Sequence, residues 1–149
     1  AKEAELDAYA AARAAAALRR QLVEQRESFA FETVLSDPVG DKVGFLKDAA
    51  DAGYTIVLCF IAISGHDVSE QRVAMRVSQG GHDVPADKLI TRFPRTMANL
   101  QLAIRTLPHV RVYDNSDLRH PYRQIATFTN GKAASTAKRV PHWLARWLG

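Results

Sequence analysis

The apolar run from Tyr54 to Ile63 restricts the possible fold more than any other part of this chain. It is short, and it is rich in β-branched and aromatic residues, so it predicts a strand. Because the run is almost unbroken, we expect the strand to be buried on both faces, as in a parallel sheet covered by helices. Cys59, the single cysteine, lies within the run and is expected to be a buried, unreactive thiol.

The segments before this run read as helix, strand and helix. Residues Lys2 to Gln25 are rich in Ala, Glu and Arg and contain no Gly or Pro, which predicts a long helix. Ser28 to Leu35 is typical of a strand. Asp37-Pro38 is a cap followed by a first-turn proline, and it predicts a helix over residues 39–52 that stops at Gly53.

The segments after the run continue the alternation. No linker or composition change divides the chain, so we expect residues 1–149 to form a single domain. The further expected elements are a helix from Asp67 or Ser69, a helix over Ala86–Thr106 opened by Pro85, strands over His109–Tyr113 and Tyr122–Phe128, a turn at Asn130-Gly131, and a terminal helix over Val140–Leu148.

Strands that alternate with helices indicate right-handed crossovers and an α/β fold, with a mainly parallel sheet between helical layers. In such sheets, ligands bind beyond the carboxyl ends of the strands. Polar residues fall at three such ends: Glu32 and Thr33 with Ser36, then Ser64-Gly65-His66, and then Asp114-Asn115-Ser116.

Glu32 follows Phe31 in an otherwise apolar strand. A carboxylate there must be paired or must face a ligand. It can bind sugar hydroxyls or act as a base, or it can pair with an arginine, and the sequence leaves these readings open. Asp114-Asn115-Ser116 is either a polar ligand-binding edge or an ordinary turn.

Four arginines flank a glycine-rich loop at residues 80–85. Arg72 and Arg76 are four apart and share a helix face, and Arg92 and Arg95 are three apart on the next helix. Such a helical lid, over about residues 69–100, can clamp a polyphosphate bidentately. His82 in the loop can donate to a phosphate, or it can cap the helix that follows. The alternative is that these are solvated surface charges.

The bulk composition excludes several function classes. Lys and Arg outnumber Asp and Glu by 20 to 16, which suits an anionic ligand but not duplex DNA. No Cys/His metal spacing and no Ser/His/Asp arrangement stands out, and we place no metal site on the chain. No apolar run is long enough to span a bilayer, so a soluble cytoplasmic protein is expected. The other four histidines look incidental.

Phosphoryl transfer requires charge neutralisation, which lid arginines can supply. It also requires a cradle for the ATP phosphates, usually GxxxxGK[ST], and an acidic residue that helps to hold magnesium. Neither this loop nor any substitute for it appears in the chain, so the sequence on its own shows half of a phosphotransferase.

Five motifs occur in an order that resembles the zeta-toxin-like family of P-loop kinases. The resemblance covers about Ala10 to Lys132 and is most specific in the glycine-rich segment. The motifs are FAFETVLS (29–36), DAGYTIVLCFI (51–61), RVAMRVSQGGHDVP (72–85), RFPRTMANL (92–100) and VYDNS (112–116).

The resemblance implies an ATP- and Mg²⁺-dependent kinase whose P-loop strand and catalytic acid precede Ala1. Glu32 matches the glutamate associated with the sugar of the substrate, and Thr33 is its neighbour. Arg72 matches the lid arginine that contacts the transferred phosphate, and Arg76 is a second clamp. His82 stands where characterised zeta toxins carry another lid arginine.

The resemblance further implies a sugar-nucleotide acceptor such as UDP-N-acetylglucosamine and an antitoxin protein as partner. The roles expected on this hypothesis are catalysis by Arg72 and Arg76, acceptor binding by Glu32, Thr33, Ser36, His82, Arg92 and Arg95, and nucleotide binding by Asp114, Asn115 and Ser116. Two alternatives stand beside this hypothesis. One is a non-catalytic nucleotide-binding or protein-interaction module, and the other, ranked last, is a polynucleotide-binding protein.

Overall fold

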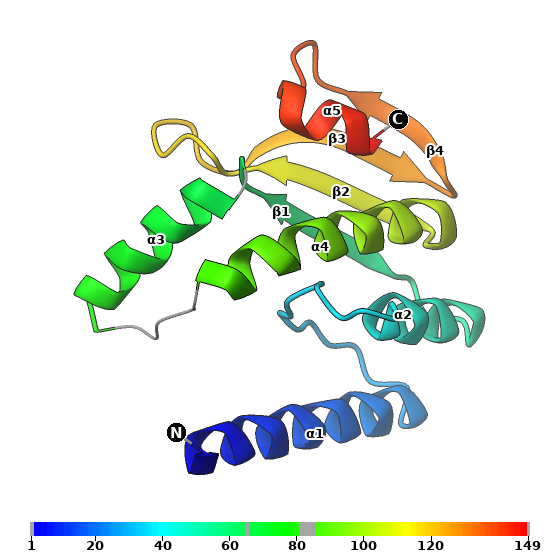
Figure 1. Ribbon diagram of the computed structural model, residues 1–149. Coiled ribbons are helices and arrows are strands. Elements are labelled where there is room, and N and C mark those ends of the chain that lie inside the picture. Colours follow the sequence, from blue (N-terminus) through cyan, green and yellow to red (C-terminus); the bar gives the residue numbers. More distant parts are fainter. Residues whose placement is uncertain (1, 65, 81–85, 149) are drawn as a thin grey trace. The chain divides into compact units, whose positions relative to one another are not determined.

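The computed structural model describes residues 2–64, 66–80 and 86–148. Contacts between residues divide the chain into two units, Ala1–Thr33 and Val34–Gly149, and each unit is described by itself. The combination of helices with a sheet confirms the α/β class. The elements, labelled in Figure 1, are α1 (Lys2–Glu24), α2 (Asp41–Asp51), β1 (Val57–Ala62), α3 (His66–Ser78), α4 (Ala86–Thr106), β2 (His109–Asp114), β3 (Arg123–Thr129), β4 (Lys132–Thr136) and α5 (His142–Leu148).

The first unit consists of helix α1 and the irregular segment that follows it. Arg26 ends the helix with a positive φ of 60°. The strand predicted over Ser28–Leu35 is wrong, because this segment has no regular structure. Its two phenylalanine rings, Phe29 and Phe31, stack on each other at 6.1 Å, and the Arg19 guanidinium of α1 lies 4.8 Å from the Phe31 ring. The two phenylalanines, two residues apart, therefore pack in a local aromatic cluster and do not form one face of a strand.

The second unit begins with a segment that leads into helix α2. The predicted start at Asp37-Pro38 is wrong, since Gly40, with φ 74°, is the N-cap and the helix begins at Asp41. The Asp37 carboxylate nevertheless accepts a hydrogen bond from the Asp41 N–H at 2.6 Å. The predicted stop at Gly53 is confirmed, because this residue adopts a φ of 100° directly after the last turn.

The sheet has the order β1-β2-β3-β4. β1 runs parallel to β2, whereas β2 with β3 and β3 with β4 are antiparallel. The expected mainly parallel sheet is thus a mixed one. Only β1 and β2 are joined by a long crossover, which consists of α3 and α4, and parallel neighbours require such a connection.

The last two strands are joined by the predicted turn at Asn130-Gly131. Both turn residues have positive φ, 49° and 78°, which produces a tight hairpin and forces antiparallel pairing. Strand β4 was not predicted. All of its residues are exposed, so it carries no apolar alternation from which a strand can be recognised.

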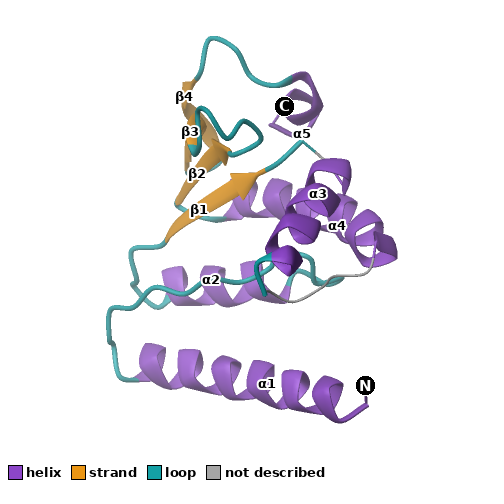
Figure 2. Ribbon diagram, turned by 90° about the vertical axis from the view of Figure 1, so that its left-hand side faces the viewer, coloured by secondary structure: helices purple, strands orange, loops and turns teal. Residues whose placement is uncertain are grey.

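Helices α3, α4 and α5 all lie on one side of this sheet (Figure 2). The core forms between them and the strands. Its fully buried side chains include Met97 and Leu100 of α4, Leu107 just after that helix, Val110 and Val112 of β2, Ile125 of β3 and Leu144 of α5.

β1 alternates between buried and exposed positions. Phe60 and Ala62 are buried, whereas Val57 and Ile61 are 46% and 52% exposed. The prediction of burial on both faces is therefore wrong, and so is the prediction for Cys59, which is exposed. The exposed side chains belong to the sheet face turned away from α3, α4 and α5.

Candidate functional site

The carboxyl ends of β1 and β2 lie side by side because the two strands are parallel. Their pairing continues one residue beyond the strands, since the Asn115 N–H donates to the Ala62 carbonyl at 2.8 Å. This contact fixes the start of the turn after β2, the edge at which ligands bind in open α/β sheets.

The Asp114 carboxylate organises this turn. It is buried, with 7% of the residue exposed, and its Oδ1 accepts hydrogen bonds from the Ser116 N–H at 3.0 Å and the Ser116 hydroxyl at 2.6 Å. Its Oδ2 lies 3.4 Å from Arg123 Nη2. This is the turn pattern that Asp favours, and it fixes the backbone at residues 115 and 116.

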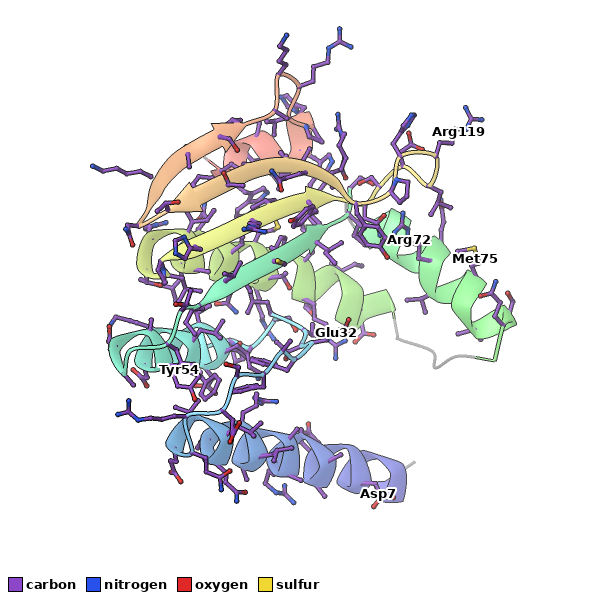
Figure 3. The ribbon with its side chains drawn as sticks, turned by 180° about the vertical axis from the view of Figure 1, so that it is seen from behind. Asp7, Glu32, Tyr54, Arg72, Met75 and Arg119 are labelled. Atoms are coloured by element: carbon purple, nitrogen blue, oxygen red, sulfur yellow. The ribbon has the colours of Figure 1, made fainter. Side chains whose placement is uncertain are left out.

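Arg72 is the lid arginine that reaches this turn. Its Nη2 donates to the carbonyl oxygen of Asn115 and, at 3.3 Å, to that of Ser116. Figure 3 shows Arg72 on α3 beside the loop that follows β2. Two segments that are 43 residues apart in sequence are thereby joined. The structure thus brings together the first candidate catalytic arginine and the candidate nucleotide-binding residues Asp114, Asn115 and Ser116.

The other candidates from the predicted lid are distributed along both of its helices. Arg76 lies one turn beyond Arg72 on α3, and its side chain is outside the described part of the structure; His82 also lies outside the described residues. On α4, Arg92 is half-buried and Arg95 is exposed. Among the described residues, no hydrogen bond connects Arg92 or Arg95 with the turn that Arg72 contacts.

Glu32 and Thr33 belong to the first unit, and both are exposed. The expectation that Glu32 is a carboxylate within an apolar strand is wrong, because the segment is irregular and open to solvent. Its charge therefore requires no buried partner.

Ser36 belongs to the second unit and is half-buried. The backbone on either side of it is held by Asn99 of α4, whose Nδ2 donates to the carbonyls of Leu35 at 3.1 Å and of Asp37 at 2.9 Å. Sequence reasoning missed Asn99. The available signal was a polar side chain among the apolar positions of a helix, since Asn99 is only 7% exposed.

A second polar cluster stabilises the loop between β2 and β3. Asp117 accepts a hydrogen bond from the Arg119 N–H at 2.8 Å, and its carboxylate lies 3.0 Å from His120 Nδ1. The hydrogen bond with His120, followed by that from the Arg119 backbone, lowers the pKa of Asp117 below its usual 3.8. His120 therefore has a partner, which the sequence did not indicate.

Neither a metal centre nor a membrane span is found in the described part of the chain. No group of three or more His, Cys, Asp or Glu side chains within residues 2–64, 66–80 and 86–148 is placed to hold a metal ion. Asp114, the acid at the start of the turn that Arg72 contacts, already accepts hydrogen bonds from Ser116 and lies 3.4 Å from Arg123 Nη2. None of the described helices has the length and apolar character to cross a membrane.

Comparison with known proteins identifies the family. A sequence model of the zeta toxin family matches residues 2–125, a span that includes α1 to α4, the sheet up to β3, and the turn that Arg72 contacts. Neither a curated protein nor a solved structure matches the chain. The family is one of kinase-type, nucleotide-binding toxins. The chain belongs to the zeta toxin family.

Proposed function

We propose that the protein is an ATP-dependent kinase of zeta-toxin type that phosphorylates a hydroxyl of a sugar nucleotide such as UDP-N-acetylglucosamine. Family membership supports the reaction class. The observation that carries the assignment to this site is the contact of Arg72 with the turn after β2. That contact holds a guanidinium at the sheet edge where an α/β fold binds its ligands.

Arg72 and Arg76 are the proposed catalytic groups. Phosphoryl transfer depends mainly on positioning and on neutralising charge that develops on the transferred group. Both hydrogen bonds from Arg72 to the turn come from Nη2. The proposal assigns its Nε and Nη1 to the phosphate, with Arg76 as the second clamp one helical turn away.

The remaining candidates divide between the acceptor and the nucleotide. Glu32, Thr33 and Ser36 bind the sugar-nucleotide acceptor, and Glu32 contacts its sugar. The phosphates of the acceptor are bound by His82, Arg92 and Arg95. Asp114, Asn115 and Ser116 bind the ATP nucleotide. No group of three or more acidic, His or Cys side chains among the described residues is placed to hold a metal ion, so the proposal leaves Mg²⁺ with the ATP phosphates and assigns no step to a protein-bound ion.

The proposed ATP cradle is a P-loop strand supplied from outside this chain. The outer edge of β1 supports this, because β1 is an edge strand of the described sheet and its outer side pairs with no described strand. A further strand beside β1, with helices over the face that carries Val57 and Ile61, would complete the expected three-layer sandwich. Action as a cytoplasmic toxin, restrained by an antitoxin protein, is part of the same proposal.

The test uses the natural full-length protein with Mg·ATP and a panel of nucleoside-diphosphate sugars, with phosphorylated product detected by mass spectrometry. Arg72→Ala should reduce kcat by about 10³-fold or more if Arg72 acts as arginine fingers do. Arg119→Ala is the matched control, since it removes an exposed guanidinium from the loop that follows the same turn.

Three outcomes separate the alternatives. Transfer that is lost in Arg72→Ala and kept in Arg119→Ala supports the proposal. Near-normal turnover of Arg72→Ala refutes the catalytic role of Arg72. ATP binding without transfer to any acceptor favours a non-catalytic nucleotide-binding module.

A further inference from the structure

Asn99 is one of two buried polar residues within the described ranges. The other, Asp114, stabilises the turn after β2. Asn99 lies on α4, between the buried Met97 and Leu100. One amide nitrogen donates to two carbonyls that are 64 and 62 residues away, those of Leu35 and Asp37. A buried amide with both of these bonds holds a distant backbone segment in place.

The segment that Asn99 holds has no strand or helix of its own. Its backbone carbonyls therefore depend on partners other than a sheet ladder, and an unpaired buried carbonyl is costly. The Asp37 carboxylate adds a further bond to the Asp41 N–H at 2.6 Å. Residues 35–37 are thus fixed at both ends of Ser36.

Gly40 shows how closely the same segment approaches α4. A Cβ placed on Gly40 would lie 3.1 Å from Leu102 Cδ2 and 3.7 Å from Asn99 Oδ1, and the φ of 74° also favours glycine. Asn99 therefore sits in a tight contact in which the backbone of residues 35–40 rests directly on α4.

From this geometry we infer that Asn99 is a positioning residue for the phosphoryl acceptor: it holds the backbone on both sides of Ser36 in the orientation that binds the acceptor. The inference rests on the proposed function, because it requires Ser36 to contact the acceptor. Asn99 itself touches no substrate in this scheme, and it acts through the carbonyls of Leu35 and Asp37.

The test compares Asn99→Asp with Val110→Ala in the full-length enzyme. Asn99→Asp keeps the shape of the side chain but removes the amide donors and places carboxylate oxygens against two carbonyls. Val110→Ala, at the second residue of β2, is a destabilising control at a fully buried site outside the contact between Asn99 and residues 35–37. Asn99→Ser, whose hydroxyl cannot span both carbonyls, replaces Asn99→Asp if the latter does not fold.

Two measurements are made on each variant: KM for the acceptor and for ATP, and hydrogen–deuterium exchange of residues 34–41. We expect Asn99→Asp to raise the acceptor KM by about tenfold, the equivalent of one lost hydrogen bond, and to leave the ATP KM within about twofold. Exchange over residues 34–41 should rise in this variant and not in Val110→Ala.

The results separate a failure of the positioning role of Asn99 from a failure of the proposed kinase function. If the wild-type enzyme transfers phosphate and Asn99→Asp keeps its acceptor KM, or shifts both KM values equally as Val110→Ala does, the positioning role is overturned while the proposed function stands. If the wild-type enzyme transfers phosphate to no acceptor, the proposed function falls and the positioning role falls with it, whatever the exchange data show.

Discussion

At the scale of single residues, Asp117 makes a local network that can be tested by titration. Hydrogen bonds with His120 and the Arg119 N–H favour its ionised form, so its pKa in the folded protein lies below 3.8. A lowered pKa means that the stabilising contribution is present above the unfolded-state pKa and is lost as the pH falls through the folded-state pKa. NMR titration of the Asp117 carboxyl carbon should show a midpoint below 3.8, and His120→Ala should move it upward. A midpoint at or above 3.8 would contradict the network.

The residue scale also shows what the sequence could and could not predict about the site. Asp114, Asn115 and Ser116 were recognisable because they directly follow a strand pattern, and the structure places Arg72 against them. Asn99 stood out only as a polar residue among the apolar positions of a helix, which does not identify its partners. Its partners, Leu35 and Asp37, are more than sixty residues away, and a side-chain-to-backbone bond over that distance leaves no local pattern.

At the scale of elements, α5 depends on its contact with α4. A helix of seven residues is too short to be stable alone. It is attached by Leu144, which is fully buried, and by the Trp143 ring, 6.2 Å from that of Phe93. Leu144→Ala should lower the free energy of unfolding by about 2–5 kcal/mol, because it removes buried methyl groups and leaves a cavity.

Urea unfolding measures this loss. The exposed His142 of the same helix provides the control, and His142→Ala should stay within about 0.5 kcal/mol of the wild type. Equal stability of the two variants would mean that α5 does not dock through Leu144.

The accuracy of the sequence-based prediction differed from one helix or strand to the next. Helix α4 has the predicted bounds, Ala86 and Thr106, because its apolar period is long and a proline precedes it. The strand predicted over residues 28–35 failed because its alternating phenylalanines stack on each other and under Arg19. Two antiparallel pairings make the sheet mixed. β3 was predicted as a strand but follows β2 without a helix between them, and β4, whose residues are all exposed, was not predicted.

At the scale of the whole molecule, stability should be highest in the centre of the sheet. β2 is paired on both sides, and its Val110 and Val112 are fully buried, whereas all residues of β4 are exposed at the edge. Native-state hydrogen exchange should therefore be slowest for the amides of β2 and markedly faster for those of β4. Equal protection of the two strands would show that β4 is covered in solution.

The exposed Cys59 is a natural labelling site on the sheet. It is the chain's single cysteine, and it lies on the face of β1 turned away from α3, α4 and α5. A thiol-reactive fluorophore therefore attaches at one defined position without any engineering of the sequence. Since both tryptophans, Trp143 and Trp147, belong to α5 on the opposite side, energy transfer from them to the label measures the thickness of the assembled layers. The rate of labelling, followed as partners or nucleotides are added, reads out whatever comes to cover this face.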